Sequence, residues 1–219
     1  MSITGVVLAG GLSRRMGGSD KSFKPLAGKT ILERVISRAK PQVKDLVLNA
    51  NGDAARFAPY GLPVVADSVA GFAGPLAGVL AGLDWAAKEV KGASHVASFA
   101  TDAPFFPLDL VRRLEEAVRD GKHDLACAAS GGREHPVFGL WPVALREDLR
   151  KALTEGVRKV DQWTARYRLA RVEFSASPYD PFFNVNSPED LAEAEKISAQ
   201  ADHLAPDRPS PAPAAPARR

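Results

Sequence analysis

Short apolar runs alternate with longer stretches of helical period along most of the chain. The stretches of helical period lie at about residues 30–41, 75–91, 107–119, 142–154, 159–166 and 187–200. The apolar runs have the length of β-strands and lie at residues 3–9, 46–48, 63–66, 94–100, 125–129, 136–140 and 170–174. Helix start signals agree with this pattern, since Thr30 and Glu33 form a capping box and Pro75 stands in a first helical turn.

This alternation predicts the α/β fold class. Connections in the first half are too long for hairpins, so the strands there are expected to run parallel, with right-handed crossovers. We therefore expect a three-layer, doubly wound, mostly parallel sheet of the Rossmann-like type, in which ligands bind beyond the carboxyl ends of the strands. The candidate segments are those that follow strands: residues 9–24, 49–53, 67–74, 101–106 and 184–186.

The last residues differ in composition from the rest of the chain. Residues 206–219 hold five of the 17 prolines and almost no large apolar side chain. Such a segment cannot bury enough surface to offset the entropy lost on ordering. We expect one domain over residues 1–202 and a disordered tail, rich in Pro, Ala and Arg, over residues 203–219.

Charge and cysteine content exclude several classes of protein. The formal net charge is +3, and the tail carries two of these charges, so no nucleic-acid-binding surface is expected on the folded part. No apolar run approaches the ~20 residues of a membrane helix. The first residues lack the basic region and cleavage site of a signal peptide. Cys127 is the only cysteine, which excludes a disulfide within the chain, and a cytoplasmic protein is expected.

A glycine-rich segment with three cations follows the first predicted strand. It reads LAGGLSRRMGGSDK and covers residues 8–21. Its first two glycines let the backbone approach a ligand, and successive N–H groups there favour an anion. Arg14, Arg15 and Lys21 add positive charge, so the segment predicts a polyphosphate site. Its spacing matches neither the P-loop nor the G-x-G-x-x-G dinucleotide fingerprint.

Two carboxylates end predicted strands and are candidates for the same site. Asp102 suits Mg²⁺, which takes one or two protein carboxylates and completes its shell with water and substrate phosphate. The alternative for Asp102 is a simple turn aspartate before Pro104. Asp67 is open to two roles, as a second metal ligand or as the acceptor for the N1–H and N2–H donors of guanine.

The glycine-rich segment resembles the signature loop of nucleotidyltransferases with the nucleotide-diphospho-sugar transferase type of fold. The resemblance is closest to the molybdenum cofactor guanylyltransferases and covers about residues 3–195. Ala103 departs from the family, where threonine is frequent, and this leaves the neighbouring carboxylate in place. Further matching segments occur in family order: Asn49-Ala-Asn51, Asp67-Ser68, Gly74-Pro-Leu-Ala-Gly78, Thr101-Asp102-Ala-Pro104, Arg133-Glu-His-Pro136 and Asn184-Val-Asn186-Ser-Pro-Glu189.

This resemblance implies transfer of GMP from Mg·GTP to the terminal phosphate of molybdenum-molybdopterin, with release of pyrophosphate and formation of the guanine dinucleotide cofactor. An ionised phosphate nucleophile needs no protein base, so positioning and charge stabilisation would account for catalysis. The expected catalytic residues are Arg15, Lys21 and Asp102, with Asp102 as the Mg²⁺ ligand. The expected nucleotide-binding residues are Leu8, Ala9, Gly10, Gly11, Lys21, Asn49, Asp67 and Asp102.

The resemblance places the pterin substrate against the second half of the chain. Polar side chains there suit the many donors and acceptors of a pterin. Gly78 has an alternative role in close packing, because it shares a helix face with Gly82, and His135 has an alternative structural role. The residues expected on the pterin side are Gly78, Arg133, His135, Asn184 and Asn186.

Several alternatives remain open from the sequence. A cytidylyltransferase that uses CTP would share the fold and the chemistry, and a sugar-phosphate or alditol nucleotidyltransferase would share the generic loop. A nucleotide-binding chaperone that delivers the cofactor without turnover is the alternative from another class. The expected partners are GTP and molybdenum-molybdopterin, with a molybdenum insertion protein and molybdoenzyme-specific chaperones, and without nucleic acid or membrane. We expect a monomer.

Overall fold

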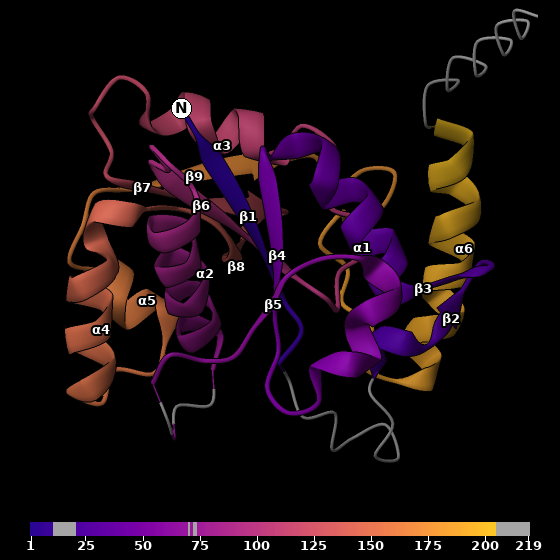
Figure 1. The fold of residues 1–219 in the computed structure, drawn as a ribbon. Coiled ribbons are helices and arrows are strands. Elements are labelled where there is room, and N and C mark those ends of the chain that lie inside the picture. Colours follow the sequence, from indigo (N-terminus) through magenta and orange to yellow (C-terminus); the bar gives the residue numbers. More distant parts are fainter. Residues whose placement is uncertain (11–20, 70, 72–73, 205–219) are drawn as a thin grey trace, which may run out of the picture.

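The chain folds around one mixed, mostly parallel sheet, as the computed structural model shows (Figure 1). The structure describes residues 1–10, 21–69, 71 and 74–204. The seven strands stand in the order β5-β4-β1-β6-β8-β7-β9. Their bounds are β1 (Ile3–Leu8), β4 (Asp45–Asn49), β5 (Val64–Val65), β6 (His95–Ala100), β7 (Leu125–Ser130), β8 (Arg133–Pro142) and β9 (Leu169–Phe174). Each predicted strand is therefore present, and the α/β class is confirmed.

One strand runs against the others. β8 is antiparallel to both β6 and β7, whereas β1, β4, β5 and β6 are parallel to their neighbours in the first half of the chain. Ser130 pairs with Arg133 across a two-residue turn, Gly131-Gly132, with φ values of 54° and 78°. Two successive positive φ angles are those of a type I′ hairpin, which favours glycine. The pattern of apolar runs does not predict this hairpin.

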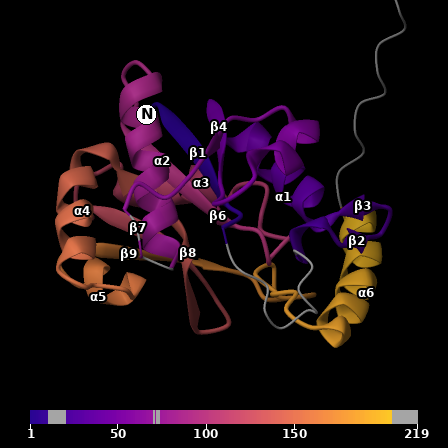
Figure 2. The same ribbon diagram turned by 60° about the horizontal axis from the view of Figure 1, so that its bottom comes forward.

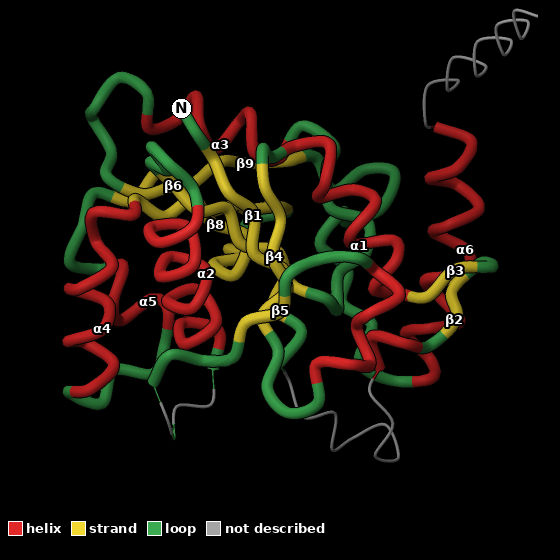
Figure 3. Tube along the Cα trace, viewed as in Figure 1, coloured by secondary structure: helices red, strands yellow, loops and turns green. Residues whose placement is uncertain are grey.

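Helices cover both faces of the sheet, so the three-layer architecture is confirmed (Figures 1 and 3). Leucines and valines of α1 and α3 pack on one face, and those of α2, α4 and α5 pack on the other. The capping box of Thr30 and Glu33 begins α1, as predicted, and Pro75 is the first residue of α2. The helices are α1 (Ile31–Ala39), α2 (Pro75–Glu89), α3 (Leu110–Val118), α4 (Arg146–Thr154), α5 (Val160–Thr164) and α6 (Pro188–Leu204).

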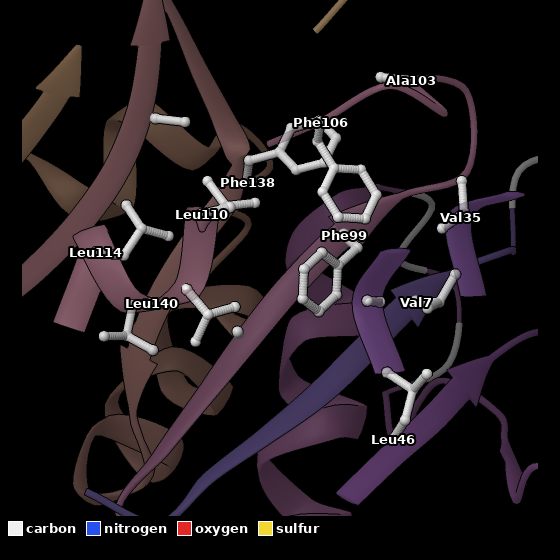
Figure 4. Packing of buried hydrophobic residues seen from close by; sticks show 14 of the residues in the cluster. Val7, Val35, Leu46, Phe99, Ala103, Phe106, Leu110, Leu114, Phe138 and Leu140 are labelled. Carbon is white, nitrogen blue, oxygen red and sulfur yellow. The ribbon is translucent and has the colours of Figure 1, made fainter. Parts of the chain in front are cut away.

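The largest part of the core lies between the sheet and helices α1 and α3 (Figure 4). Phe106 belongs to it, with its ring centre 5.1 Å from that of Phe99 and 5.5 Å from that of Phe138. Ala103 belongs to the same cluster and is fully buried. The segment after β6, which carries Asp102, is therefore fixed to the core on its carboxyl-terminal side.

A small hairpin and the last helix form a separate unit at one side of the sheet (Figures 1 and 2). The hairpin pairs β2 (Pro25–Leu26) with β3 (Lys29–Thr30), and α6 lies against it. Leu26, Phe105 and Val185 meet Ala194 and Ile197 of α6 in one buried cluster. This cluster joins the segments that follow β1, β6 and β9. They carry the predicted site residues Lys21, Asp102 and Asn186, respectively.

The shorter elements and the ends complete the description. The 3-10 helices are η1 (Lys21–Phe23), η2 (Lys40–Gln42), η3 (Ala54–Tyr60) and η4 (Val143–Leu145). Helix α6 continues to Leu204, whereas the remainder of the predicted tail lies outside the described residues. In the described part of the chain, no helix has both the length and the apolar character needed to cross a membrane. Cys127 is buried in β7, and burial raises the pKa of its thiol to about 11.

Candidate active site

The carboxyl end of β1 lies at the point where the sheet order reverses. β1 is hydrogen-bonded to β4 on one side and to β6 on the other, and the chain forms β4 and β5 before it returns to add β6. The Ala9 N–H donates to the Asn49 carbonyl at 2.8 Å, and Thr101 Oγ1 donates to the Leu8 carbonyl at 3.1 Å. These bonds join the segments after three strands at the place where doubly wound sheets bind ligands.

Three polar side chains converge beside this point. Lys21 Nζ donates to Asp102 Oδ2 at 3.2 Å and to Asn186 Oδ1 at 2.7 Å. The Val185 N–H donates to the Asp102 carbonyl at 2.7 Å, so the segment with Asn186 is also bonded to the segment with Asp102 through the backbone. The side chains of Lys21 and Asp102 retain 20% and 30% of their exposure, so a ligand has access to both. We call Lys21, Asp102 and Asn186 the transfer cluster.

A second polar cluster follows β4 and β5. Asp67 Oδ1 accepts from Asn49 Nδ2 at 2.9 Å, and Asp67 Oδ2 accepts from Asn51 Nδ2 at 2.8 Å. The Asp67 N–H donates back to Asn51 Oδ1 at 3.0 Å. Gly10 lies against the same group, since a Cβ on it would be 3.5 Å from Asn49 Oδ1. The structure thus brings Ala9, Gly10, Asn49 and Asp67 together, and adds Asn51, which the predicted site residues did not include.

Gly78 of α2 packs directly against Asn49. A Cβ at this position would lie 2.3 Å from Asn49 Oδ1 and 2.7 Å from Leu8 Cδ2. Close packing therefore requires glycine here, and the contact is with the predicted nucleotide side. The contacts of Gly78 supply no support for the predicted role on the pterin side.

His135 belongs to a buried hydrogen-bonded group under the β7–β8 hairpin. Its Nε2 lies 2.8 Å from Ser130 Oγ, and Ser130 Oγ donates to Asp180 Oδ1 at 2.8 Å. The His135 ring stacks on Phe182 with the ring centres 4.5 Å apart. Burial, with a smaller contribution from the positive charge of Arg133, lowers the pKa of His135, and the negative charge of Asp180 opposes this shift.

The other predicted residues fall into two groups. Arg133 is exposed at the tip of the β7–β8 hairpin, and Asn184 lies two residues before Asn186 in the segment that leads to α6. Gly11, Arg14 and Arg15 lie outside the described residues, so their predicted roles stay predictions. Ser130 and Asp180 were not among the predicted site residues. Ser130 meets His135 only when the β7–β8 hairpin forms, and it meets Asp180 only when the segment before α6 packs on that hairpin.

The oxygen atoms around Asp102 fit a metal ion that receives most of its coordination from substrate phosphates and water. Within the described residues, no group of three or more His, Cys, Asp or Glu side chains could form a metal cage. Asp102 is a single, partly exposed carboxylate. The amide oxygen of Asn186 lies nearby, since it accepts a hydrogen bond from the same Lys21 ammonium group. Magnesium accepts such a site when substrate phosphates and water complete its octahedral shell.

Comparison with proteins of known sequence agrees with this geometry. Residues 5–171 match the family described as the MobA-like NTP transferase domain. A molybdenum cofactor guanylyltransferase of Bradyrhizobium sp. strain ORS 278 is 59% identical over 202 residues, which cover 92% of this chain and 95% of that protein. The protein of the same name from Rhizobium meliloti is 45% identical, over 87% of this chain and 89% of its own length.

Solved structures share the fold at much lower identity. Molybdopterin-guanine dinucleotide biosynthesis protein A from Archaeoglobus fulgidus has a TM-score of 0.71 and 23% identity, covering 90% of this chain and 99% of that one. The 4-diphosphocytidyl-2C-methyl-D-erythritol synthase of Anaerococcus prevotii has a TM-score of 0.69 and 13% identity, over 90% and 96%. A Mycobacterium tuberculosis protein solved in complex with manganese has a TM-score of 0.63 and 18% identity, over 90% and 99%. With its sheet, its switch-point site and relatives of this identity, the chain belongs to the MobA-like nucleotidyltransferases and, within them, to the molybdenum cofactor guanylyltransferase family.

Proposed function

We propose that this chain transfers GMP from Mg·GTP to the terminal phosphate of molybdenum-molybdopterin. The observation that supports this most is the transfer cluster, in which Lys21 bridges Asp102 and Asn186 beside the end of β1. A cation, a carboxylate and an amide that converge at a switch point suit a metal-bound polyphosphate. The naming of close relatives as molybdenum cofactor guanylyltransferases supports the same reaction.

The reaction exchanges one phosphorus–oxygen bond for another. A terminal phosphate oxygen of the pterin substrate forms a bond to the α-phosphorus of GTP, and the bond between the α- and β-phosphates breaks to release pyrophosphate. The attacking phosphate is already ionised, so the chain needs no general base. This agrees with the transfer cluster, which holds a lysine, a carboxylate and an amide but no histidine.

The residues of the chain then act by position and charge. Lys21 would hold the polyphosphate and stabilise the negative charge that develops on the leaving group. Asp102 and Asn186 would hold Mg²⁺ together with the phosphates. When bound, Mg²⁺ neutralises phosphate charge and acts as a Lewis acid on the phosphoryl oxygens. Each such interaction is worth about 2–4 kcal/mol in a transition state.

The cluster of Asn49, Asn51 and Asp67 would receive the base. Asp67 is oriented by two amide groups, at 2.9 and 2.8 Å, so its carboxylate is fixed before any ligand arrives. A carboxylate with lone pairs still available matches the N1–H and N2–H donors of guanine. This favours the base-binding role of Asp67 over the metal-binding role, and guanine over cytosine, which lacks this pair of adjacent ring and amino donors.

The pterin substrate would lie on the side of β8 and the segment before α6. Arg133 is exposed at the hairpin and suits a phosphate, while Asn184 and Asn186 follow Phe182 and Phe183 toward α6. Proteins that supply the pterin or accept the product, namely a molybdenum insertion protein and molybdoenzyme-specific chaperones, would approach this side. We propose that the chain works as a monomer.

Release of pyrophosphate tests the proposal directly. Purified chain is incubated with molybdenum-molybdopterin, Mg²⁺ and either GTP or CTP, and pyrophosphate and the dinucleotide product are measured. The proposal requires release with GTP well above that with CTP. Release only with CTP would establish the cytidylyltransferase, and binding of GTP without release would establish the cofactor-delivery chaperone.

A further inference from the structure

Ser130 lies at the centre of a buried link between the β7–β8 hairpin and the segment before α6. Its side chain is bonded to His135 Nε2 and to Asp180 Oδ1, each at 2.8 Å. Ser130 is 2% exposed and His135 is 9% exposed. A carboxylate oxygen only accepts, so the Ser130 hydroxyl proton points to Asp180 and Ser130 Oγ accepts from His135 Nε2–H. This order leaves serine without a base, so the group is not a nucleophilic triad.

The link fixes the start of the segment that contains Asn186. Asp180 Oδ1 also accepts from the Phe182 N–H at 3.0 Å, and the Asp180 carbonyl accepts from the Phe183 N–H at 3.1 Å. The Phe182 ring packs against the rings of His135 and Phe138, with ring centres 4.5 Å and 5.0 Å away. Phe182 is therefore held both by hydrogen bonds to its backbone and by aromatic packing on its side chain.

The far end of the same segment reaches the transfer cluster. Val185 is fully buried, and its N–H donates to the Asp102 carbonyl at 2.7 Å. The next residue, Asn186, accepts from Lys21 Nζ at 2.7 Å. Only Phe183 and Asn184 separate the two fixed points, Phe182 and Val185. The backbone between the Asp180 link and Asn186 is therefore short and held at both ends.

We propose that Ser130 and Asp180 are positioning residues that set Asn186, and through it Lys21, for the transfer reaction. The inference rests on the proposed function for its effect on turnover, but not for the structural link itself. In this arrangement Ser130 touches neither substrate nor metal. Its hydroxyl determines where Asp180 lies, Asp180 determines where Phe182 and Phe183 begin, and these determine the position of Asn186.

Ser98 offers a matched control for Ser130. It is also a buried serine in the central sheet, 1% exposed, and its Oγ donates to the Val137 carbonyl at 2.5 Å and accepts from Trp141 Nε1 at 2.8 Å. The Gly139 N–H also donates to Ser98 Oγ, at 3.4 Å. Ser130→Ala and Ser98→Ala therefore each remove a buried hydroxyl, with two hydrogen bonds in the first case and three in the second. Their effects on thermal stability are expected to be alike, and their effects on the transfer cluster are expected to differ.

Amide hydrogen exchange tests the link without any substrate. In Ser130→Ala, the peptide over residues 182–187 should exchange faster by about tenfold, the change that corresponds to ~1.4 kcal/mol. Ser98→Ala should leave this peptide unchanged. Asp180→Asn keeps an oxygen acceptor at Oδ1 and should resemble the wild type, whereas Asp180→Ala should resemble Ser130→Ala. Equal exchange over residues 182–187 in Ser130→Ala and Ser98→Ala would overturn the inference.

A double-mutant cycle then tests the effect on turnover. Ser130→Ala should lower kcat by about tenfold in the wild-type background but by less than about twofold in the Asn186→Ala background, because its route of action is already lost. Ser98→Ala should have the same small effect in both backgrounds. Additive effects of Ser130→Ala and Asn186→Ala on kcat would contradict the positioning role. Absence of turnover in the wild-type chain would overturn the proposed function. The hydrogen-exchange comparison of Ser130→Ala with Ser98→Ala would still decide whether Ser130 and Asp180 hold residues 182–187.

Discussion

Lys21 Nζ lies 3.2 Å from Asp102 Oδ2, although 81 residues separate them in the chain. Lys21 is the last residue of the glycine-rich segment that follows β1, and Asp102 follows β6, the strand on the opposite side of the switch point from β4. The ammonium group therefore occupies one oxygen of the carboxylate that we assign to Mg²⁺. On binding of Mg·GTP, Lys21 would pair with a phosphate and Asp102 would pair with Mg²⁺. Each residue would thus replace the other by a group of the ligand.

Asp102→Asn should reduce turnover far more than nucleotide binding. The amide keeps an oxygen for Lys21 but loses the charge that we expect the metal to require, so kcat should fall by about 10²–10³-fold while the dissociation constant for GTP changes little. Pyrophosphate release and equilibrium binding measure the two quantities. Asp109→Asn removes a carboxylate that pairs with Arg112 at 2.9 Å on the surface of the protein, and serves as the control. Normal kcat in Asp102→Asn would remove this residue from the metal site.

Gly78→Ala should weaken nucleotide binding through Asn49. The new Cβ would lie 2.3 Å from Asn49 Oδ1 and would displace that side chain from Asp67. The overpacking should also lower the free energy of unfolding by ~1–3 kcal/mol. Gly82→Ala is the matched control on the same helix face, because its Cβ would meet Val6 at 2.8 Å and not Asn49. Both variants should unfold at lower denaturant concentration, but only Gly78→Ala should raise the dissociation constant for GTP. Equal affinities in the two variants would contradict the predicted contact with the nucleotide side.

Asp67→Asn should reduce the preference for guanine. The substituted amide replaces one acceptor oxygen of the carboxylate by an NH2 donor, so the paired contact with the N1–H and N2–H of guanine would be lost. ITP lacks the amino group of GTP, and the ratio of kcat/KM for GTP to that for ITP should fall toward one in this variant. A hydrogen bond to a charged group is worth about 1.5–3 kcal/mol, which sets the scale of the expected loss.

The metal-binding alternative for Asp67 predicts a different result. In that case the ratio between GTP and ITP would stay as in the wild type, and the Mg²⁺ concentration needed for half-maximal rate would rise. Ser68→Ala, at the neighbouring exposed position, provides the control for local disturbance of this segment.

The free energy of unfolding should fall as the pH drops below about 6.5, the ordinary pKa of histidine. Burial lowers the pKa of His95, and the positive α-amino group of Met1 lowers it further, against the opposing charge of Glu115. The unfolded chain therefore takes up a proton at this residue more readily than the folded chain. Stability from neutral His95 is fully present above the unfolded pKa and is lost as the pH falls through the lowered, folded pKa.

Urea unfolding at pH 7.5 and pH 5.5 measures this effect. His95→Gln removes the titrating group and should reduce the loss of stability between the two pH values. His123→Gln changes a histidine that is exposed in the structure and serves as the control. A loss in His95→Gln as large as in the wild type would place the pH dependence elsewhere, and His135, whose pKa is also lowered by burial, would be tested next.

Much of the fold follows from local patterns. The apolar runs locate the strands, and Thr30 with Glu33 locates the start of α1, because both signals depend on neighbouring residues alone. The β7–β8 hairpin also has a local signal, Gly131-Gly132, the residue pair that a type I′ turn favours. The break in its ladder after Cys127 occurs opposite a stretch that contains Pro136, which has no N–H to donate.

The sequence by itself determined the class of the fold, since this depends on residue types in a fixed order. It also predicted a phosphate-binding first loop and a metal-binding role for Asp102, and both stay predictions. It left open whether Gly78 serves packing or substrate, and it did not indicate that Ser130 and Asp180 lie in contact. Only the tertiary structure decided these points: Gly78 faces Asn49 across two elements, and Ser130 meets Asp180 over 50 residues. Contacts of this kind depend on how strands and helices pack, and no local pattern of residues encodes them.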